Sequence, residues 1–347
     1  MKIIKIEDAL KQKNVVFVDV RTSNEFTDGT IYGAINIPIF DNEERELIGY
    51  TYKQIGKQQA KEIGLEIASK KLMNIYNELK KIHDSNNKIV IFCARGGMRS
   101  GSIVKVMEMM HINICQLEGG YKDYRKYVLN KFDEWNLDRK FLVLRGGTGV
   151  GKTDLLNRLE QEGYNTLDLE KMANHRGSVF GNIGLGKQTS QKTFEAEIFH
   201  KVYNMNDKFI FIEAESSKIG NRVVPKFANN GIVSGVPIKI TCDINVRALR
   251  LINEYKDCDD EQFIVDMLNS LKRIKSYMDN ENYNNIKQAI EMKEYKEAAI
   301  ILLEKYYDPL YIKWEKKYEN NSYTQDTTNF EEVIINLIKI YEEQCAL

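Results

Sequence analysis

The sequence contains no long apolar run. No stretch of its 347 residues approaches the roughly 20 apolar residues that a membrane-spanning helix needs. The opening segment, MKIIKIEDAL, meets charged side chains at once and lacks the apolar core of a secretory signal. We therefore expect a protein of the cytoplasm without a membrane partner.

Cysteine and histidine are also scarce. The five cysteines show no C-x-x-C spacing, and none of the four histidines belongs to a pair at metal-binding spacing. These absences exclude a disulfide framework and a zinc site of the usual kinds. We expect no tightly bound cofactor.

A surplus of charge is absent as well. Lys and Arg together number 50, Asp and Glu together number 50, and the formal net charge is zero. A protein that binds nucleic acid usually carries a basic surplus, so the balance counts against a uniformly basic surface. A local basic patch governs phosphate binding, and a nucleic-acid partner therefore stays open.

The length and the apolar pattern predict an α/β protein with two or three domains. The run VVFVDV at residues 15–20 is typical of a strand buried in a parallel sheet, and the polar segment 131–140 is typical of a domain boundary. Apolar side chains recur at helical spacing from about residue 246. We predict α/β domains at residues 1–130 and 139–245 and a helical C-terminal region at 246–347.

The segment KIVIFCARGGMRSGS, residues 88–102, predicts a reactive cysteine. It reads as a buried strand that ends at Cys93, followed by a glycine turn and a helix that Ser100 can cap. Loop N–H groups and the guanidiniums of Arg95 and Arg99 would lower the pKa of the thiol and make it a nucleophile or an acceptor. The alternative is a buried structural thiol.

A second motif, RGGTGVGKT at residues 145–153, matches the phosphate-binding pattern G-x-x-x-x-G-K-[ST]. An apolar strand precedes it and a helix with periodic leucines follows, as the motif requires. Lys152 would reach the terminal phosphate and Thr153 would bind Mg²⁺. The predicted phosphate-binding residues are Gly146, Gly147, Thr148, Gly149, Gly151, Lys152 and Thr153.

Acidic residues follow two further predicted strands. A strand over residues 164–170 would put Asp168 and Glu170 on one face, and a strand over residues 209–212 leads into Glu213 and Glu215. An acidic residue at this place in a phosphate-loop fold orients Mg²⁺ or water. We predict a magnesium site at Thr153 and Glu213, with Asp168 and Glu215 as further substrate-site candidates.

The polar, glycine-punctuated segment MANHRGSVFG at residues 172–181 predicts a functional loop. His175, Arg176 and Ser178 are its candidates for substrate contact, although a lone histidine is more often structural. Farther on, Arg247 and Arg250 would form a lid over phosphates or a solvated helix face. Aromatics and lysines alternate at residues 305–318, which suits either RNA stacking or helix packing.

Residues 1–130 resemble a rhodanese domain. The resemblance rests on DVRTSNEF at 19–26, GTIYGAINIP at 29–38, the strand that ends at Cys93, and LEGGYKDYR at 117–125. It implies a persulfide or perselenide on Cys93, with Asp19 and Arg21 as structural supports. Thr30 replaces the family's usual His. The longer spacing from Cys93 to Arg99 is similar to the cysteine phosphatase signature, but Phe92 replaces that signature's preceding His.

The whole chain resembles the tRNA 2-selenouridine synthase family. Beyond the two loops, the matching segments are ANHRGSVFG at 173–181, SQKTFE at 190–195, EAESSKIG at 213–220 and YDPLY at 307–311. Ala214 and Ser217 depart from the acidic residue and arginine that are commoner in the family. The resemblance implies that 2-thiouridine in the anticodon arm of tRNA is geranylated from geranyl diphosphate. Selenium from selenophosphate then replaces the sulfur.

Two other functions stay open. One is an ATP-dependent kinase or phosphatase fused to a rhodanese module, and the other is a non-catalytic adaptor that relays sulfur to a partner. Turnover of ATP without tRNA would favour the first, and a dispensable Lys152 would favour the second. The sequence does not determine the oligomeric state, for which a monomer is a reasonable expectation.

Overall fold

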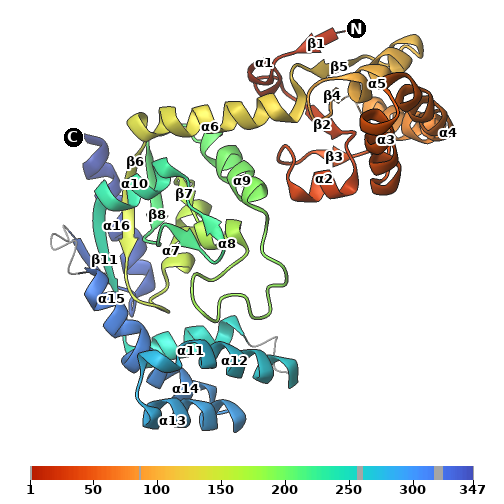
Figure 1. The fold of residues 1–347 in the computed structure, drawn as a ribbon. Helices are drawn as coiled ribbons and strands as arrows, with labels where there is room; N and C mark the ends of the chain where they lie inside the picture. The colour runs from red at the N-terminus through yellow and green to blue at the C-terminus, as the bar shows by residue number, and fades with distance from the viewer. Residues whose placement is uncertain (1, 86, 256–260, 316–322, 347) are drawn as a thin grey trace. The chain divides into compact units, whose positions relative to one another are not determined.

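The computed structural model describes residues 2–85, 87–255, 261–315 and 323–346 (Figure 1). Its contacts divide the chain into two compact units. Unit 1 comprises Met1–Lys131 and Ser190–His200, and unit 2 comprises Phe132–Thr189 and Lys201–Leu347. The change of unit at residue 131 falls inside helix α6 (Gly120–Asp138), so the polar segment predicted as a boundary is helical and not a loop.

Unit 1 is built on a parallel five-stranded sheet in the order β1-β5-β4-β2-β3. Its strands are β1 (Lys2–Ile4), β2 (Val15–Asp19), β3 (Ile35–Asn36), β4 (Lys88–Phe92) and β5 (Ile114–Leu117). In the register of the central pair, Asp19 lies opposite Phe92. The two segments of the rhodanese resemblance therefore end side by side, and Cys93 follows at this edge of the sheet.

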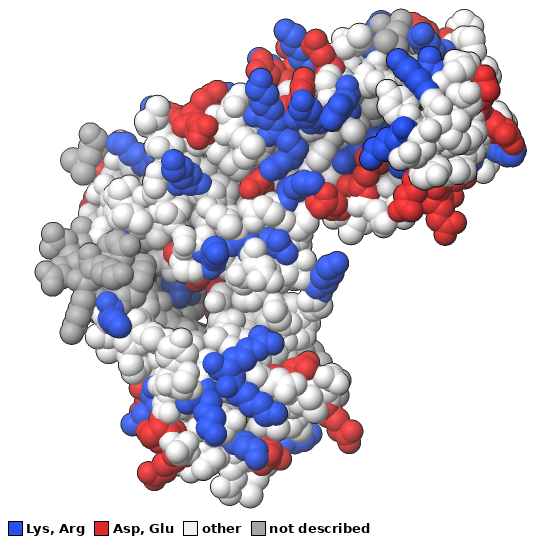
Figure 2. All heavy atoms as spheres, in the orientation of Figure 1, with Lys and Arg blue, Asp and Glu red and all other residues white. Residues whose placement is uncertain are grey.

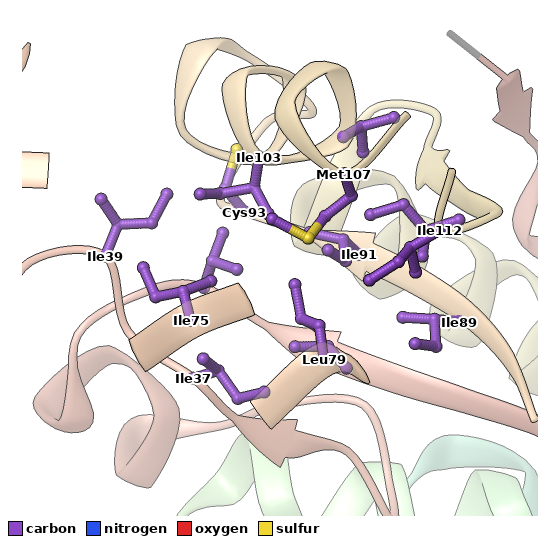
Figure 3. Packing of buried hydrophobic residues seen from close by; sticks show 14 of the residues in the cluster. Ile37, Ile39, Ile75, Leu79, Ile89, Ile91, Cys93, Ile103, Met107 and Ile112 are labelled. Carbon is purple, nitrogen blue, oxygen red and sulfur yellow. The ribbon is translucent and has the colours of Figure 1, made fainter. Parts of the chain in front are cut away.

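Unit 1 has both long and short helices in addition to this sheet. They are α1 (Ile6–Leu10), α2 (Ser23–Asp28), α3 (Asn42–Gln54), α4 (Lys57–Asp84), α5 (Met98–Met109), the first part of α6 and most of α9 (Gln191–Tyr203). Figure 3 shows Ile75 and Leu79 of α4 and Ile103 and Met107 of α5 pointing toward strand β4. Cys93 belongs to this cluster, at the end nearest Ile103.

Unit 2 is built on a second parallel five-stranded sheet, in the order β12-β11-β6-β8-β7. The strands are β6 (Lys140–Arg145), β7 (Thr166–Leu167), β8 (Phe209–Glu213), β11 (Val236–Thr241) and β12 (Tyr323–Asp326). A short antiparallel pair, β9 (Lys218–Ile219) and β10 (Arg222–Val223), lies apart from it. Strands β6 and β8 are parallel neighbours in this sheet. The phosphate loop, which follows β6, and Glu213, which ends β8, therefore lie at the same edge of the sheet.

The helices of unit 2 form two groups. The first comprises α7 (Lys152–Gln161), α8 (Leu169–Ala173), α10 (Lys226–Ser234) and α16 (Phe330–Ala346). The second comprises α11 (Ile244–Glu254), α12 (Glu261–Arg273), η2 (Lys275–Tyr277), α13 (Asn280–Glu291), α14 (Tyr295–Leu302), the π turn η3 (Leu303–Tyr307) and α15 (Asp308–Glu315). Figure 1 shows α11 to α14 gathered as one bundle. As predicted, α7 buries Leu155, Leu156 and Leu159.

Two predicted elements need correction. The strand expected over residues 164–170 comprises only Thr166–Leu167, because Asp168 accepts a hydrogen bond from the Lys171 N–H and begins α8. The C-terminal region is largely helical, but β12 pairs with β11 and α16 packs against the sheet. Val333 and Leu337 of α16 share a core with Leu142, so this part of the region belongs to the phosphate-loop fold.

In the described part of the chain, no helix combines the length and apolar character that a bilayer crossing requires.

Candidate functional site

Cys93 lies at the end of β4, where the chain turns toward α5. It is buried, with 3% of its surface exposed. Its sulfur accepts hydrogen bonds from the Gly97 N–H at 3.3 Å and from the Ser100 hydroxyl at 3.2 Å. Ser100 was expected to cap the helix. Instead α5 begins after Gly97, which offers no side-chain cap, and Ser100 turns toward the sulfur from within the helix.

The pKa of Cys93 results from opposing effects. Burial raises the pKa of the thiol, and hydrogen bonds from the Ser100 hydroxyl and from the N–H groups of Ser100, Arg95 and Gly97 lower it. The hydrogen bonds prevail, so the pKa lies below that of an ordinary cysteine. The sequence predicted this direction, but it assigned a share of the effect to the arginine charges.

The two predicted arginines occupy different surroundings. Arg99 forms a two-pronged ion pair with Glu25, with Nη1 2.6 Å from Oε2 and Nη2 3.2 Å from Oε1. Arg95 is exposed at the surface of the loop. Glu25 compensates the charge of Arg99. Burial raises the pKa of Glu25, but the hydrogen bond and charge of Arg99, together with the Thr22 N–H and the charge of Arg21, lower it below its usual value. Arg95 is therefore the freer of the two guanidiniums for an anionic donor.

Neighbouring segments hold the Cys93 loop in place. The Tyr121 and Lys122 N–H groups donate to the carbonyls of Cys93 and Ala94 at 2.9 and 3.0 Å. Gly120 has a φ of +59°, and a side chain there would overlap the Cys93 carbonyl. This close approach explains the second glycine of the LEGGY segment.

The pair of Asp19 and Arg21 is a buried ion pair with a 2.6 Å Nη2–Oδ2 distance. Arg21 donates to the Gly29 carbonyl at 2.7 Å, and the Thr30 hydroxyl donates to Asp19 at 2.9 Å. Thr30, at the position of the family's usual His, thus completes this network. The Arg21 guanidinium also lies 4.0 Å from the centre of the Tyr121 ring, so the pair contacts both the segment at residues 29–30 and a residue that holds the Cys93 loop.

The phosphate loop connects β6 to α7. The Lys152 ammonium folds back and donates to the carbonyls of Gly146 and Gly147 at 2.9 and 3.3 Å. A phosphate entering the loop would compete with these neutral acceptors for the ammonium, and the charged partner makes the stronger hydrogen bond. Lys152 is thus held where it can bind a phosphate that enters the loop.

Arg247 and Arg250 were expected either to form a lid over phosphates or to face solvent. Arg247 is buried and does neither, whereas Arg250 lines the cavity that contains the phosphate loop. Arg247 donates to the Thr148 carbonyl at 2.9 Å and pairs with Asp308 at 2.6 Å. Arg250 donates to the Val150 carbonyl at 2.9 Å. Both guanidiniums thus bind carbonyls of the phosphate loop and hold its backbone in place.

Four carboxylates lie beside the phosphate loop. Asp168, Glu170, Glu213 and Glu215 all line the same cavity, of about 690 Å³. Burial is the largest cause that raises the pKa of each, and neighbouring carboxylates raise those of Glu170 and Glu213 further, well above their usual range. Without a cation in the cluster, these groups are expected to keep their protons to a higher pH than ordinary carboxyl groups do.

Three of these residues fit a hard divalent cation. Glu170, Glu213 and Glu215 each offer an oxygen, and these oxygens lie within 4.8 Å of one another. Among the described residues, Glu213 Oε2 and Asp168 Oδ2 are buried without a hydrogen-bond partner. Oxygen donors of this kind suit Mg²⁺. Glu213 was predicted for this role; Glu170 and Glu215 extend the set, and Thr153 lines the same cavity.

The predicted loop at residues 172–181 starts as the end of α8 and then lines the cavity with His175, Arg176 and Ser178. The His175 ring is buried against Gly181 and Gly220, and burial lowers its pKa. Arg176 donates to the Ile183 carbonyl at 2.7 Å and lies over the Tyr255 ring at 4.5 Å. The side chains of His175 and Arg176 line the cavity, and their contacts with the surrounding chain also hold its wall in place.

A second cavity, of about 230 Å³, adjoins the first. Thr148, Ser178, Leu251, Tyr255 and Tyr307 line both cavities. The remaining walls of the second cavity are apolar or aromatic and come from α11, α12, α14 and the loop after α8; they are Phe180, Ile252, Phe263, Met267, Tyr295, Ala298, Ala299 and Leu302. A phosphate-binding cavity thus opens beside an apolar one.

Sequence reasoning missed several of these residues. Glu170 was noticed only as a neighbour of Asp168, and Tyr255 and Tyr307 were not proposed. Tyr307 ends the π turn η3 and shares a hydrogen bond with Ser178. Turns of this kind often occur at functional sites. The YDPLY segment was the available signal, but a π turn has no recognisable sequence pattern. The aromatic and lysine alternation at 305–318 lies partly outside the described residues.

Comparisons with known proteins agree with both halves of this description. A family model described as the tRNA 2-selenouridine synthase AAA domain matches residues 139–341, and the rhodanese-like domain model matches residues 4–127. A tRNA 2-selenouridine synthase of Shewanella denitrificans is 32% identical over 279 residues, which cover 79% of this chain and 74% of that protein.

Two further matches are less complete. The chain is 31% identical over 254 residues to a tRNA 2-selenouridine synthase of Nitrosomonas eutropha, covering 71% of this chain but only 64% of that relative. A crystal structure of the N-terminal domain of a proposed ATP/GTP binding protein from Clostridium difficile 630 is 49% identical, with a TM-score of 0.36. That match covers 37% of this chain and 99% of the solved domain.

Proposed function

The chain belongs to the tRNA 2-selenouridine synthase family, and from this membership we propose that it converts 2-thiouridine in tRNA to 2-selenouridine in two steps. In the first step, the sulfur of the base takes a geranyl group from geranyl diphosphate. In the second step, selenium from selenophosphate replaces the geranylated sulfur. The enzyme is then a transferase that acts on the wobble uridine of the anticodon arm in the cytoplasm.

The observation that carries this proposal is the apolar cavity beside the phosphate loop. A prenyl diphosphate needs one polar and one apolar compartment that share a boundary, and the two cavities share Thr148 and Tyr307. An apolar cavity of about 150 Å³ binds benzene. The apolar cavity of about 230 Å³ is therefore large enough to take up a short prenyl chain such as geranyl.

In the first step the thiocarbonyl sulfur forms a bond to the terminal allylic carbon, and the carbon–oxygen bond to diphosphate breaks. The N–H groups of the loop and Lys152 stabilise the negative charge that develops on the leaving diphosphate. Mg²⁺ held by Glu213 and its neighbours would neutralise further charge. The base loses its N3 proton as the sulfur becomes alkylated, so charge and atoms balance without ATP.

In the second step selenium bonds to C2 of the base, and the sulfur leaves with its geranyl group as geranylthiol. Water attacks the phosphorus of the donor, the phosphorus–selenium bond breaks, and phosphate is released. We assign Cys93 to this step as the thiolate beside which the selenium donor binds, so that selenide passes from phosphorus to C2 without a change of oxidation state. Arg95 attracts the negative charge of the donor, whereas Glu25 compensates the charge of Arg99. The lowered pKa of Cys93 supports this role, because a thiolate is the reactive form of cysteine.

Binding of tRNA requires a surface that attracts phosphates, although the chain carries no net charge. Figure 2 shows Lys and Arg side chains gathered on the visible face of the helical bundle of unit 2, with Asp and Glu mainly at its margins. Such a local surplus can bind an RNA backbone when the whole-chain charge is zero. We propose this face as a contact for tRNA.

The test uses geranyl diphosphate, Mg²⁺ and tRNA that contains 2-thiouridine, with the nucleosides analysed by mass spectrometry. We expect a geranyl-mass addition that Lys152→Ala abolishes. The matched control is Lys208→Ala, whose exposed side chain forms an ion pair with Asp138 at the surface. Consumption of ATP with no modified nucleoside from folded protein would refute the proposal and favour the kinase-like alternative.

A further inference from the structure

We propose that Gln116 and Ser100 are positioning residues for Cys93: the Gln116 amide orients the Ser100 hydroxyl so that its hydrogen points at the cysteine sulfur. This inference rests on the proposed function, in which the selenium donor binds beside the Cys93 thiolate. It concerns a chain of three side chains that no sequence motif connects, since Gln116 lies on β5, beyond the whole of α5.

The orientation of the Gln116 amide follows from its partners. The side chain is buried, with 4% of its surface exposed. Its Nε2 lies 2.8 Å from the Gly96 carbonyl oxygen, 3.1 Å from the Gly97 carbonyl oxygen and 2.8 Å from Ser100 Oγ. Carbonyl oxygens only accept hydrogen bonds, so the amide must present its NH₂ group to them and not its oxygen.

This orientation decides the direction of the Ser100 hydroxyl. Because Ser100 Oγ accepts an N–H from Gln116, its own hydrogen must be donated elsewhere. The nearest acceptor is Cys93 Sγ at 3.2 Å, ahead of the Gly97 carbonyl at 3.4 Å. Ser100 is fully buried, so no solvent competes for the hydroxyl. Cys93 thus receives one fixed O–H donor in addition to the Gly97 N–H.

Hydrogen bonds to the Cys93 sulfur come from neutral groups and not from charged side chains. The charged groups of the loop and of α2 nearest to it are Arg95, Arg99 and Glu25; Arg99 is neutralised by Glu25, and Arg95 is exposed. A neutral hydroxyl and backbone N–H groups can hold an anionic sulfur without adding a charge that would repel or bind the anionic donor. Arg95 then remains available to attract selenophosphate.

The test measures the rate at which iodoacetamide alkylates Cys93 as a function of pH, using the intact protein without tRNA. Mass spectrometry of the peptide that contains Cys93 separates it from the other four cysteines. The variants are Ser100→Ala, Gln116→Met and the conservative Ser100→Thr. The matched control is Ser102→Ala, an exposed serine of the same helix whose hydroxyl bonds to the Arg99 carbonyl.

We expect Ser100→Ala to move the midpoint of the profile upward by about one pH unit, as for loss of one hydrogen bond to a charged group. Gln116→Met should move it in the same direction by a smaller amount, and Ser100→Thr and Ser102→Ala should leave it near the wild-type value. An unchanged midpoint in folded Ser100→Ala protein would overturn the inference. Should Gln116→Met fail to fold, Gln116→Asn is used, and an unchanged midpoint there would exclude Gln116.

A second readout separates this inference from the proposed function. Ser100→Ala and Gln116→Met should keep wild-type geranylation, which depends on the phosphate loop, and lose selenation in proportion to the shifted profile. If the profile shifts but wild-type protein transfers no selenium, the proposed function fails and the positioning role stands. If selenation falls without any shift in the profile, the positioning role fails.

Discussion

At the scale of single residues, burial governs the chemistry of the phosphate cavity. Glu213 is 1% exposed and ends a central strand, so its carboxylate cannot turn to water. Glu170 and Glu215 add like charges beside it. Gly177, with a φ of +63°, lets the following loop pass close to both of these carboxylates, where a side chain would collide with Glu170. The cluster therefore faces the cavity and is covered on its other sides by the chain.

We expect this cluster to make stability depend on pH. Because burial raises the pKa values of Glu213 and Glu170, the folded chain holds protons that the unfolded chain releases. The unfolding free energy of metal-free protein should therefore be greatest below about pH 4.3 with respect to these groups, and should fall as the pH rises toward the folded-state values. Urea unfolding at a series of pH values measures this slope.

The controls for that slope are Glu213→Gln, which should flatten it, and Glu162→Gln, an exposed partner of Arg158 that should not. Saturating Mg²⁺ should restore stability at the higher pH values, since a ligand of the folded state stabilises by mass action. A slope that is unchanged in Glu213→Gln would contradict the proposed origin.

At the scale of elements, the π turn between α14 and α15 shapes the apolar cavity. It places Tyr307 where it lines both cavities and leaves Ala298, Ala299 and Leu302 as one wall. Asp308 follows directly and pairs with Arg247, which holds the Thr148 carbonyl. One irregular helical segment thus connects the wall of the proposed prenyl site with the phosphate loop.

This wall should determine the length of the prenyl chain. Met267→Ala enlarges the cavity, and we expect it to improve the use of farnesyl diphosphate relative to geranyl diphosphate by about tenfold or more, since each methylene contributes about 1–3 kcal/mol of discrimination. Ala299→Leu should have the opposite effect and reduce the use of geranyl diphosphate. Competition between the two diphosphates, read by nucleoside mass spectrometry, gives the ratio.

Leu249→Ala is the matched control for that series, because Leu249 lies on α11 with half of its surface exposed and does not line the cavity. A ratio that moves equally in Leu249→Ala and Met267→Ala would show that the cavity does not hold the chain.

At the scale of the whole molecule, the two proposed steps belong to different units. Cys93, Ser100 and Gln116 lie in unit 1, whereas Lys152, the acidic cluster and the apolar cavity lie in unit 2. Each unit has its own parallel sheet and its own core. Substitutions in one site should therefore leave the fold and the chemistry of the other intact.

We expect Cys93→Ser to stop at geranylated 2-thiouridine and Lys152→Ala to leave 2-thiouridine unmodified. A mixture of the two variants should form 2-selenouridine again, because the geranylated tRNA made by one can bind to the other. Nucleoside analysis of each variant and of the mixture measures this. Geranylation lost in folded Cys93→Ser protein would contradict the separation of the two steps.

Much of this architecture could be predicted from the sequence, because the patterns that indicate it involve residues close together in the chain. The strand-loop-helix patterns around Cys93 and Lys152 depend on neighbouring residues, so both loops and the parallel α/β sheets were predicted correctly. The short β7 was not, because the Asp168 side chain satisfies the Lys171 N–H and begins a helix where alternation suggested a strand.

The sequence alone determined the two loops, their glycines and the order of the α/β units, since backbone conformation and apolar periodicity act over short distances. Only the tertiary structure decided which distant side chains meet. It paired Arg99 with Glu25, turned Arg247 and Arg250 onto the loop carbonyls, gathered Glu170 with Glu213 and Glu215, and brought Gln116 to Ser100. These contacts depend on strand register and helix packing, which join residues that no spacing in the chain connects.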